Sequence, residues 1–119
     1  MCNLPRLLLA VMPCVAGLTL AQEFPAKAIR YVVLSAPGGS SDTLARVMAP
    51  RLGELLGPQM LIDGRAGASG VIGAEIVVRA SADGHTLLQA ATSHATNPAK
   101  GVKLPYDLLR DFAPIALLS

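Results

Sequence analysis

LSAPGGSSDTLAR, residues 34–46, connects a short apolar run to a segment with helical periodicity. The run before it, IRYVVL at residues 29–34, is rich in β-branched residues and predicts a buried strand. After it, apolar side chains recur at helical spacing from residue 44 to residue 56, and Gly57-Pro58 provides a stop signal. The sequence therefore predicts a strand, a glycine-rich loop and a helix, in that order.

The same order of elements recurs further along the chain. Residues 60–62 predict a second short strand, DGRAGASG at 63–70 a second glycine-rich loop, and residues 71–80 a second apolar helix. Asp83-Gly84 then turns the chain into a third strand at residues 85–91. Strands that alternate with helices predict an α/β fold, in which a βαβαβ unit forms a parallel sheet with right-handed crossovers. A last apolar run at residues 113–118 has the composition of a further strand.

Pro50 and Gly53 lie inside the predicted first helix. Proline removes one helical hydrogen bond and costs about 3 kcal/mol or kinks the helix, and glycine weakens the helix further. We therefore expect this helix to continue with a kink near Ala49.

The first 21 residues, MCNLPRLLLAVMPCVAGLTLA, combine one basic residue, an apolar segment and small residues at the end. This pattern is typical of a secretory signal peptide, with cleavage after Ala21. A transmembrane anchor is the alternative, but it needs about 20 unbroken apolar residues, and Pro13 and Gly17 interrupt this run. Lipid attachment at Cys14 is disfavoured because a proline precedes the cysteine where lipoprotein signals have a small, flexible residue.

Removal of this segment changes the charge and the cysteine content. Arg6 and both cysteines leave with it, so nine basic residues remain against eight acidic ones, a net charge of +1. Such a nearly neutral chain lacks the electrostatic footprint of a nucleic-acid-binding protein. It also has no disulfide and no thiolate ligand. We expect an exported, periplasmic domain at residues 22–119.

The first glycine-rich loop has features that favour an anion. A loop that leaves a strand and opens a helix presents backbone N–H groups that no helical carbonyl uses, next to the positive end of the helix dipole. Gly38 and Gly39 allow a ligand to approach the backbone, and Ser40 and Ser41 add hydroxyl donors. Asp42 is expected to be structural, as a helix cap or loop brace. Taken alone, the loop also fits a tight turn with a capping serine and no ligand.

Two more loops share this character. GASG at 67–70 opens the second helix, and ATSHATN at 91–97 follows the third strand. In a parallel sheet all three loops emerge at the carboxyl edge, where ligands bind. No lysine lies between Lys27 and Lys100, which excludes a Walker-type phosphate loop. Backbone and hydroxyl donors fit a carboxylate better, and a dinucleotide is the weaker alternative because the glycines of the second loop only approach the Rossmann fingerprint.

Patterns for catalysis and metal binding are lacking. The chain has no G-x-S-x-G motif, and its two histidines, His85 and His94, have no partners at metal-ligand spacing. His85 is expected at the surface or a strand edge, whereas His94 lies in the third loop and is a candidate for lining a pocket. We therefore expect no enzyme activity, no metal and no cofactor.

The chain resembles the substrate-binding proteins of tripartite tricarboxylate transporters, also called Bug proteins, in three stretches. They are PAKAIRYVVLSAPGGSSDTLARVMAPRLGELLG at 25–57, IDGRAGASGVIGAEIVVRASADGHTLL at 62–88 and NPAKGVKLPYDLLRDFAPIALL at 97–118. The resemblance implies a periplasmic binding protein with a type II-like fold, whose two α/β domains close on a small organic acid. That acid would be a di- or tricarboxylate or an amino acid, passed on to membrane transporter subunits. The ligand-binding residues implied by the resemblance are Pro37, Gly38, Gly39, Ser40, Ala68, Ser69, Gly70, Thr92, Ser93 and His94.

The chain departs from the family pattern in its second loop and in its length. Gly64 and Ala66 replace the usual Asn and Pro, and Ser69 replaces a Gly, so the loop is expected to be less rigid. Family members are several times longer, and we therefore expect a truncated N-terminal part of the first domain, without the second domain. A non-functional remnant is the main alternative to a binding protein, and a fragment of an α/β dinucleotide-binding enzyme is a weaker one.

Overall fold

The computed structural model describes residues 23–118 and shows a parallel sheet of three strands. The strands are β1 (Ile29–Val33), β2 (Met60–Gly64) and β3 (Thr86–Gln89), and they lie in the order β2-β1-β3. Both neighbours run parallel to β1, with Val33 opposite Gly64 on one side and Gln89 on the other. The predicted βαβαβ order and parallel sheet are confirmed, although β2 is longer and β3 shorter than the sequence predicted. The predicted signal peptide lies outside the described residues.

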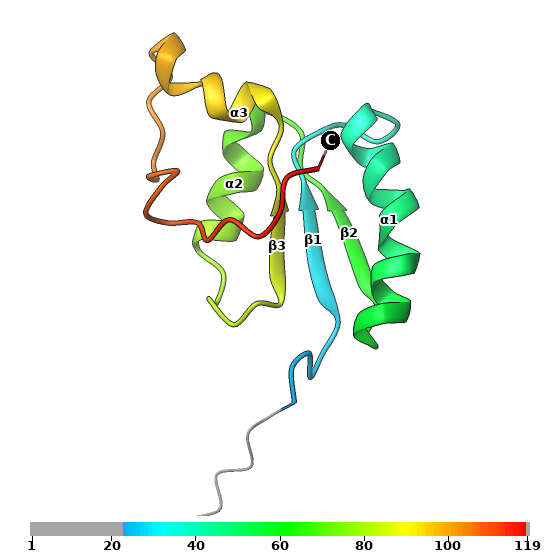
Figure 1. The fold of residues 1–119 in the computed structure, drawn as a ribbon. Helices are drawn as coiled ribbons and strands as arrows, with labels where there is room; N and C mark the ends of the chain where they lie inside the picture. The colour runs from blue at the N-terminus through cyan, green and yellow to red at the C-terminus, as the bar shows by residue number, and fades with distance from the viewer. Residues whose placement is uncertain (1–22, 119) are drawn as a thin grey trace, which may run out of the picture.

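Two helices cover opposite faces of this sheet (Figure 1). Helix α1 (Ser40–Leu56) packs on the face to which Ile29, Tyr31 and Val33 point, and these side chains form the core with Ala45 and Ala49 of the helix. Helix α2 (Val71–Val78) covers the other face, where Leu34 lies against Gly70 and Gly73. Alternation along β1 therefore divides the apolar side chains between the two helices.

Helix α1 continues across Pro50 without interruption. Proline has no N–H group, so the carbonyl of Arg46, four residues earlier, lacks its usual helical donor. The exposed position of Pro50 leaves that carbonyl at the helix surface.

The segment after β3 differs from the sequence prediction. Residues expected as a loop form a short helix, α3 (Thr92–Thr96), followed by the 3₁₀ turn η2 (Pro98–Lys100). The apolar run at 113–118 forms no strand with any residue that the structure describes, and Ile115 and Leu117 are 79% and 92% exposed. Its composition predicted a strand, but a strand requires a hydrogen-bonded neighbour, which this part of the chain does not have. None of the described helices is long and apolar enough to cross a membrane.

An ion pair at the amino edge of the sheet predicts how stability responds to acid. Asp83 accepts hydrogen bonds from Lys27 Nζ at 2.9 Å and from the backbone N–H of His85 at 3.0 Å, and these lower the pKa of Asp83 from 3.8 to about 2. Because the folded pKa is depressed, the stabilisation is fully present above about pH 4 and is lost as the pH falls through about 2. We expect Asp83→Asn to make the urea midpoint less dependent on pH between these values. Parallel curves for the two proteins would contradict this prediction.

Candidate functional site

The carboxyl edge of the sheet brings together the three loops that the sequence singled out. Because β1, β2 and β3 are parallel and in register at Val33, Gly64 and Gln89, the segments that follow them emerge on the same side. Figure 1 shows the starts of α1, α2 and α3 at this edge. The site residues predicted from the sequence are therefore contributed by three segments that converge in space.

The first loop leaves backbone donors free at the start of α1. Gly39 is the N-cap, and its carbonyl accepts the first helical hydrogen bond from Thr43 N–H at 2.9 Å. No side chain caps this helix, and among residues 23–118 no acceptor binds the backbone N–H groups of Ser40 and Ser41. The alternative of a capping serine is therefore not realised. The exposed Ser40 can offer a ligand both its N–H and its hydroxyl group.

Asp42 lies beneath this loop and braces it. Its side chain is 2% exposed, and Oδ2 accepts hydrogen bonds from the backbone N–H of Gly38 at 2.9 Å and from Arg46 Nε at 2.8 Å. Both hydrogen bonds lower the pKa of Asp42, and the bond from Arg46 has the larger effect. The Gly38 bond fixes a residue with φ of +83°, a conformation that favours glycine. The carboxylate therefore binds one side of the loop, while Gly38 and Ser40 stay exposed on the loop.

The second loop is held in a left-handed conformation. Ala68 and Ser69 have φ values of +45° and +53°, which are uncommon for residues with a Cβ, and such geometry often occurs at functional sites. Asn97, only 1% exposed, donates from Nδ2 to the Ser69 carbonyl at 3.0 Å. At the start of the loop, Arg65 donates its backbone N–H to the Val33 carbonyl at 2.8 Å. The loop is thus tied to β1 on one side and to the chain after α3 on the other.

Sequence reasoning missed the role of Asn97. The sequence pattern places Asn97 only in a hydroxyl-rich loop, although an Asn followed by Pro98 is a signal for a structural turn. Its carbonyl also accepts hydrogen bonds from the backbone N–H groups of Lys100 and Val102, both at 3.1 Å. Asn97 therefore connects the second loop with the third.

The third segment places its predicted residues in different surroundings. Thr92 and Ser93 are exposed in the first turn of α3, so their hydroxyl groups are open to the site edge. His94 is 1% exposed, and its ring stacks on Tyr106 with centroids 5.5 Å apart and meets Phe112 edge-on. Burial lowers the pKa of His94, which favours the neutral imidazole. The histidine packs the segment after α3 onto the site.

Together the loops make an edge rich in hydrogen-bond donors. Backbone N–H groups at the start of α1 and hydroxyls from Ser40, Ser69, Thr92 and Ser93 are suited to a carboxylate, and Gly38 and Gly39 leave the backbone accessible. The described residues contain no group of three His, Cys, Asp or Glu side chains that could hold a metal ion.

The comparison with protein families identifies the chain. A model of the tripartite tricarboxylate transporter family receptor matches residues 44–119. The chain belongs to this family. Members of this receptor family bind substrates for a transporter and are not enzymes, which argues against the dinucleotide-enzyme alternative.

Curated relatives of this receptor family are much longer than the chain. It is 36% identical to Protein BugT of Bordetella pertussis, an alignment that covers 98% of the chain and 38% of BugT. It is 38% identical to a UPF0065 protein from the tcbD-tcbE intergenic region of Pseudomonas sp. strain P51, over 79% of the chain and 28% of that protein. The chain thus spans about a third of the length of these relatives.

Solved structures of receptors have the same arrangement of elements. MatC from Rhodopseudomonas palustris, solved with bound malate, has a TM-score of 0.74 and 38% identity over 80% of this chain and 33% of MatC. A TctC solute-binding protein from Polaromonas has a TM-score of 0.64 and 29% identity, covering 67% of this chain and 28% of that protein. An R. palustris protein solved with adipate has a TM-score of 0.53 and 41% identity, covering 56% of this chain and 22% of that protein. These likenesses confirm the prediction of part of a periplasmic binding protein fold.

Proposed function

We propose that this chain supplies part of the binding site of a periplasmic receptor that captures a small organic carboxylate for uptake. The observation that carries the proposal is the cluster of free backbone N–H groups at Ser40 and Ser41, joined at one sheet edge by the second and third loops. The malate and adipate bound to structural relatives support a dicarboxylate as the first ligand to test. Tricarboxylates and amino acids are the other classes, and the receptor would deliver its ligand to membrane transporter subunits.

The residues proposed to form the carboxylate site come from all three loops. The first loop gives the closest backbone approach and the second contributes the Ser69 hydroxyl. Thr92 and Ser93 add hydroxyl groups from α3. His94 is buried and supports the site by packing against Tyr106 and Phe112. The full set comprises Pro37, Gly38, Gly39, Ser40, Ala68, Ser69, Gly70, Thr92, Ser93 and His94.

Full affinity is proposed to need more of the receptor than this chain contains. Micromolar binding corresponds to about 8 kcal/mol, whereas each hydrogen bond to a charged group contributes about 1.5–3 kcal/mol at most, and less where water competes for the same carboxylate. Loops exposed on one side leave a carboxylate largely hydrated. We therefore expect residues 22–119 alone to bind malate more weakly than micromolar.

Calorimetry on two proteins tests this proposal. One is residues 22–119, and the other joins them to the part of MatC that follows the aligned region, here named the joined receptor. Malate, adipate and citrate are titrated into each. Binding by the joined receptor, together with weak or absent binding by the shorter chain, is the expected result. Micromolar binding by the shorter chain would refute the need for a second part, and a folded joined receptor that binds none of the acids would refute the carboxylate site.

Export of the chain is a separate proposal. A basic residue, an apolar run and small residues at the cut occur together in residues 1–21, and we predict cleavage after Ala21. N-terminal sequencing of protein recovered from the periplasm should begin at Gln22. Uncut protein recovered from the cytosol would contradict the prediction.

A further inference from the structure

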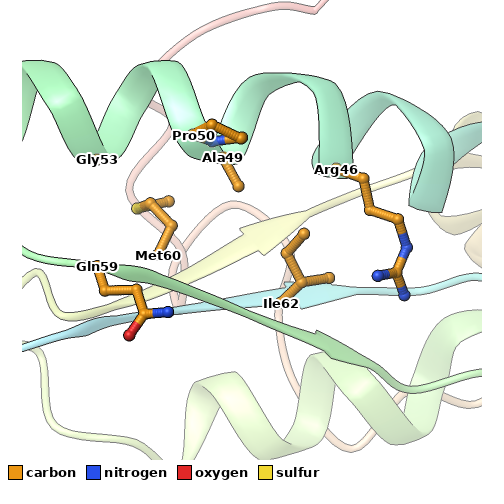
Figure 2. A pocket seen from close by; sticks show the side chains of 7 residues that line it. All are labelled: Arg46, Ala49, Pro50, Gly53, Gln59, Met60 and Ile62. Atoms are coloured by element: carbon orange, nitrogen blue, oxygen red, sulfur yellow. The ribbon is translucent and has the colours of Figure 1, made fainter.

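A groove beside α1, next to the core residues Ala49 and Met60, is not part of the carboxylate site. It has a volume of about 500 Å³ and lies between α1 and the outer edge of β2 (Figure 2). Ala49, Pro50 and Gly53 line it from the helix, and Met60 and Ile62 from the strand. Arg46 and Gln59 lie at its two ends. The floor is therefore apolar and the ends are polar.

The backbone of β2 is open along this groove. Ile29 N–H donates to the Gln59 carbonyl at 3.0 Å, and Arg65 N–H donates to the Val33 carbonyl at 2.8 Å, so odd-numbered residues of this strand point their backbone groups toward β1. Along a strand these directions alternate. The N–H and C=O groups of Met60, Ile62 and Gly64 therefore point away from β1, and among residues 23–118 no strand lies beyond β2 on this side. An edge of this kind can accept another strand.

Arg46, Pro50 and Gly53 determine which segment the groove can accept. Arg46 is its only charged lining residue; its side chain is 61% exposed, and only Nε is bonded to Asp42. Pro50, another lining residue, leaves the Arg46 carbonyl without a helical donor. Gly53 keeps the opposite end open, because a Cβ there would meet only the Pro58 carbonyl, at 3.6 Å.

We propose that this groove binds an extended acidic peptide segment of a partner protein, which adds a strand to the free edge of β2. Main-chain hydrogen bonds would form with Met60, Ile62 and Gly64. Alternate side chains would enter the groove, with apolar ones over Met60 and Ile62 and a carboxylate at Arg46. The proposal does not depend on the carboxylate site, because the groove lies beside α1 and β2 rather than at the three loops.

Two synthetic peptides of opposite charge test the proposal on residues 22–119. Acetyl-VTVTET-amide places two valines and a glutamate on one face of a strand, and acetyl-VTVTKT-amide replaces that glutamate by lysine. In ¹⁵N NMR spectra the glutamate peptide is expected to shift the amide signals of Met60, Ile62 and Gly64. The lysine peptide is expected to bind at least about fivefold more weakly, because it meets Arg46 with a like charge.

Variants separate this groove from a general effect on folding. Gly53→Leu fills the groove with a side chain and also raises the helix propensity of α1. The variant should therefore stay folded and no longer bind the glutamate peptide. Arg46→Gln should remove the difference between the two peptides. Arg51→Gln is the matched control, because Arg51 is an exposed arginine of α1 that pairs with Glu54 outside the groove; it should bind as the original chain does.

Three results would overturn the proposal. The first is no shift at Met60, Ile62 or Gly64 with the glutamate peptide at up to about 1 mM, the range of weak single-strand binding. The second is equal affinity of the chain for the two peptides, or an unchanged affinity of the Gly53→Leu variant for the glutamate peptide. The third is a dimer in light scattering that Gly53→Leu dissociates, since a second copy of this chain would then be the occupant.

Discussion

Malate binding by the joined receptor should fall about tenfold to a hundredfold when Ser40 becomes proline, and much less when it becomes alanine. Proline removes the backbone N–H as well as the hydroxyl, and a hydrogen bond to a charged group contributes about 1.5–3 kcal/mol. Alanine removes the hydroxyl alone. The difference between the two variants therefore measures the backbone donor at the start of α1.

The proline variant is suited to this test because the fold accommodates it. Ser40 is the first residue of α1, the position where proline is favoured, and Gly39 before it has φ of −68° and ψ of 165°, which a following proline allows. The melting temperature should therefore stay within a few degrees. Equal binding by the proline and alanine variants would show that the Ser40 N–H does not contact the ligand.

Gly39→Val should abolish binding at the same loop. A Cβ at Gly39 would lie 3.1 Å from the Ala36 carbonyl and 3.3 Å from Ser35 Cβ, so a branched side chain must turn toward the ligand or displace the loop. Val47→Ala, at a 70% exposed position of α1, is the control and should bind normally. If Gly39→Val folds and binds malate unchanged, the carboxylate lies elsewhere.

Gly73→Leu should destabilise the fold by about 2–3 kcal/mol, a large part of the 5–15 kcal/mol typical of a domain. A Cβ at Gly73 would overlap the Leu34 side chain and lie 3.1 Å from Arg65 Cβ and 3.2 Å from the Arg65 carbonyl. Helix α2 would have to move away from the sheet. Urea unfolding measures the loss, and Ile72→Leu at a 48% exposed position should be nearly neutral.

A second substitution tests the cause of this loss. Leu34→Ala removes the side chain that Gly73→Leu would strike, so the double variant should be more stable than the sum of the two single effects by 1 kcal/mol or more, roughly the coupling of residues in contact. Strict additivity would mean that the close approach of α2 to Leu34 is not what requires a glycine at residue 73.

Local patterns in the sequence were sufficient for the order of the elements. The β-branched run before Leu34, the helical spacing after Ser41 and the glycines before Val71 each predict an element from neighbouring residues, and the structure confirms all three. The parallel sheet follows as well, because a helix between two strands carries the chain back to the edge where the first strand began, so both strands run in the same direction. Convergence of three loops at one edge is a consequence of that topology.

What depended on distant contacts was decided only by the tertiary structure. The segment 92–96 is a helix, and the run 113–118 pairs with no strand in the part of the chain that the structure describes, although their local patterns suggested a loop and a strand. His94 is buried by Tyr106 and Phe112, and Asn97 binds the Ser69 carbonyl across 28 residues of sequence. The sequence by itself determined the order and approximate positions of the strands, the first two helices and the donor-rich loops, because these follow from side-chain periodicity and backbone freedom within a few residues. The tertiary structure decided which side chains are exposed at the edge of the sheet and which brace the loops, because burial and hydrogen-bond partners arise only when segments far apart in the chain pack together.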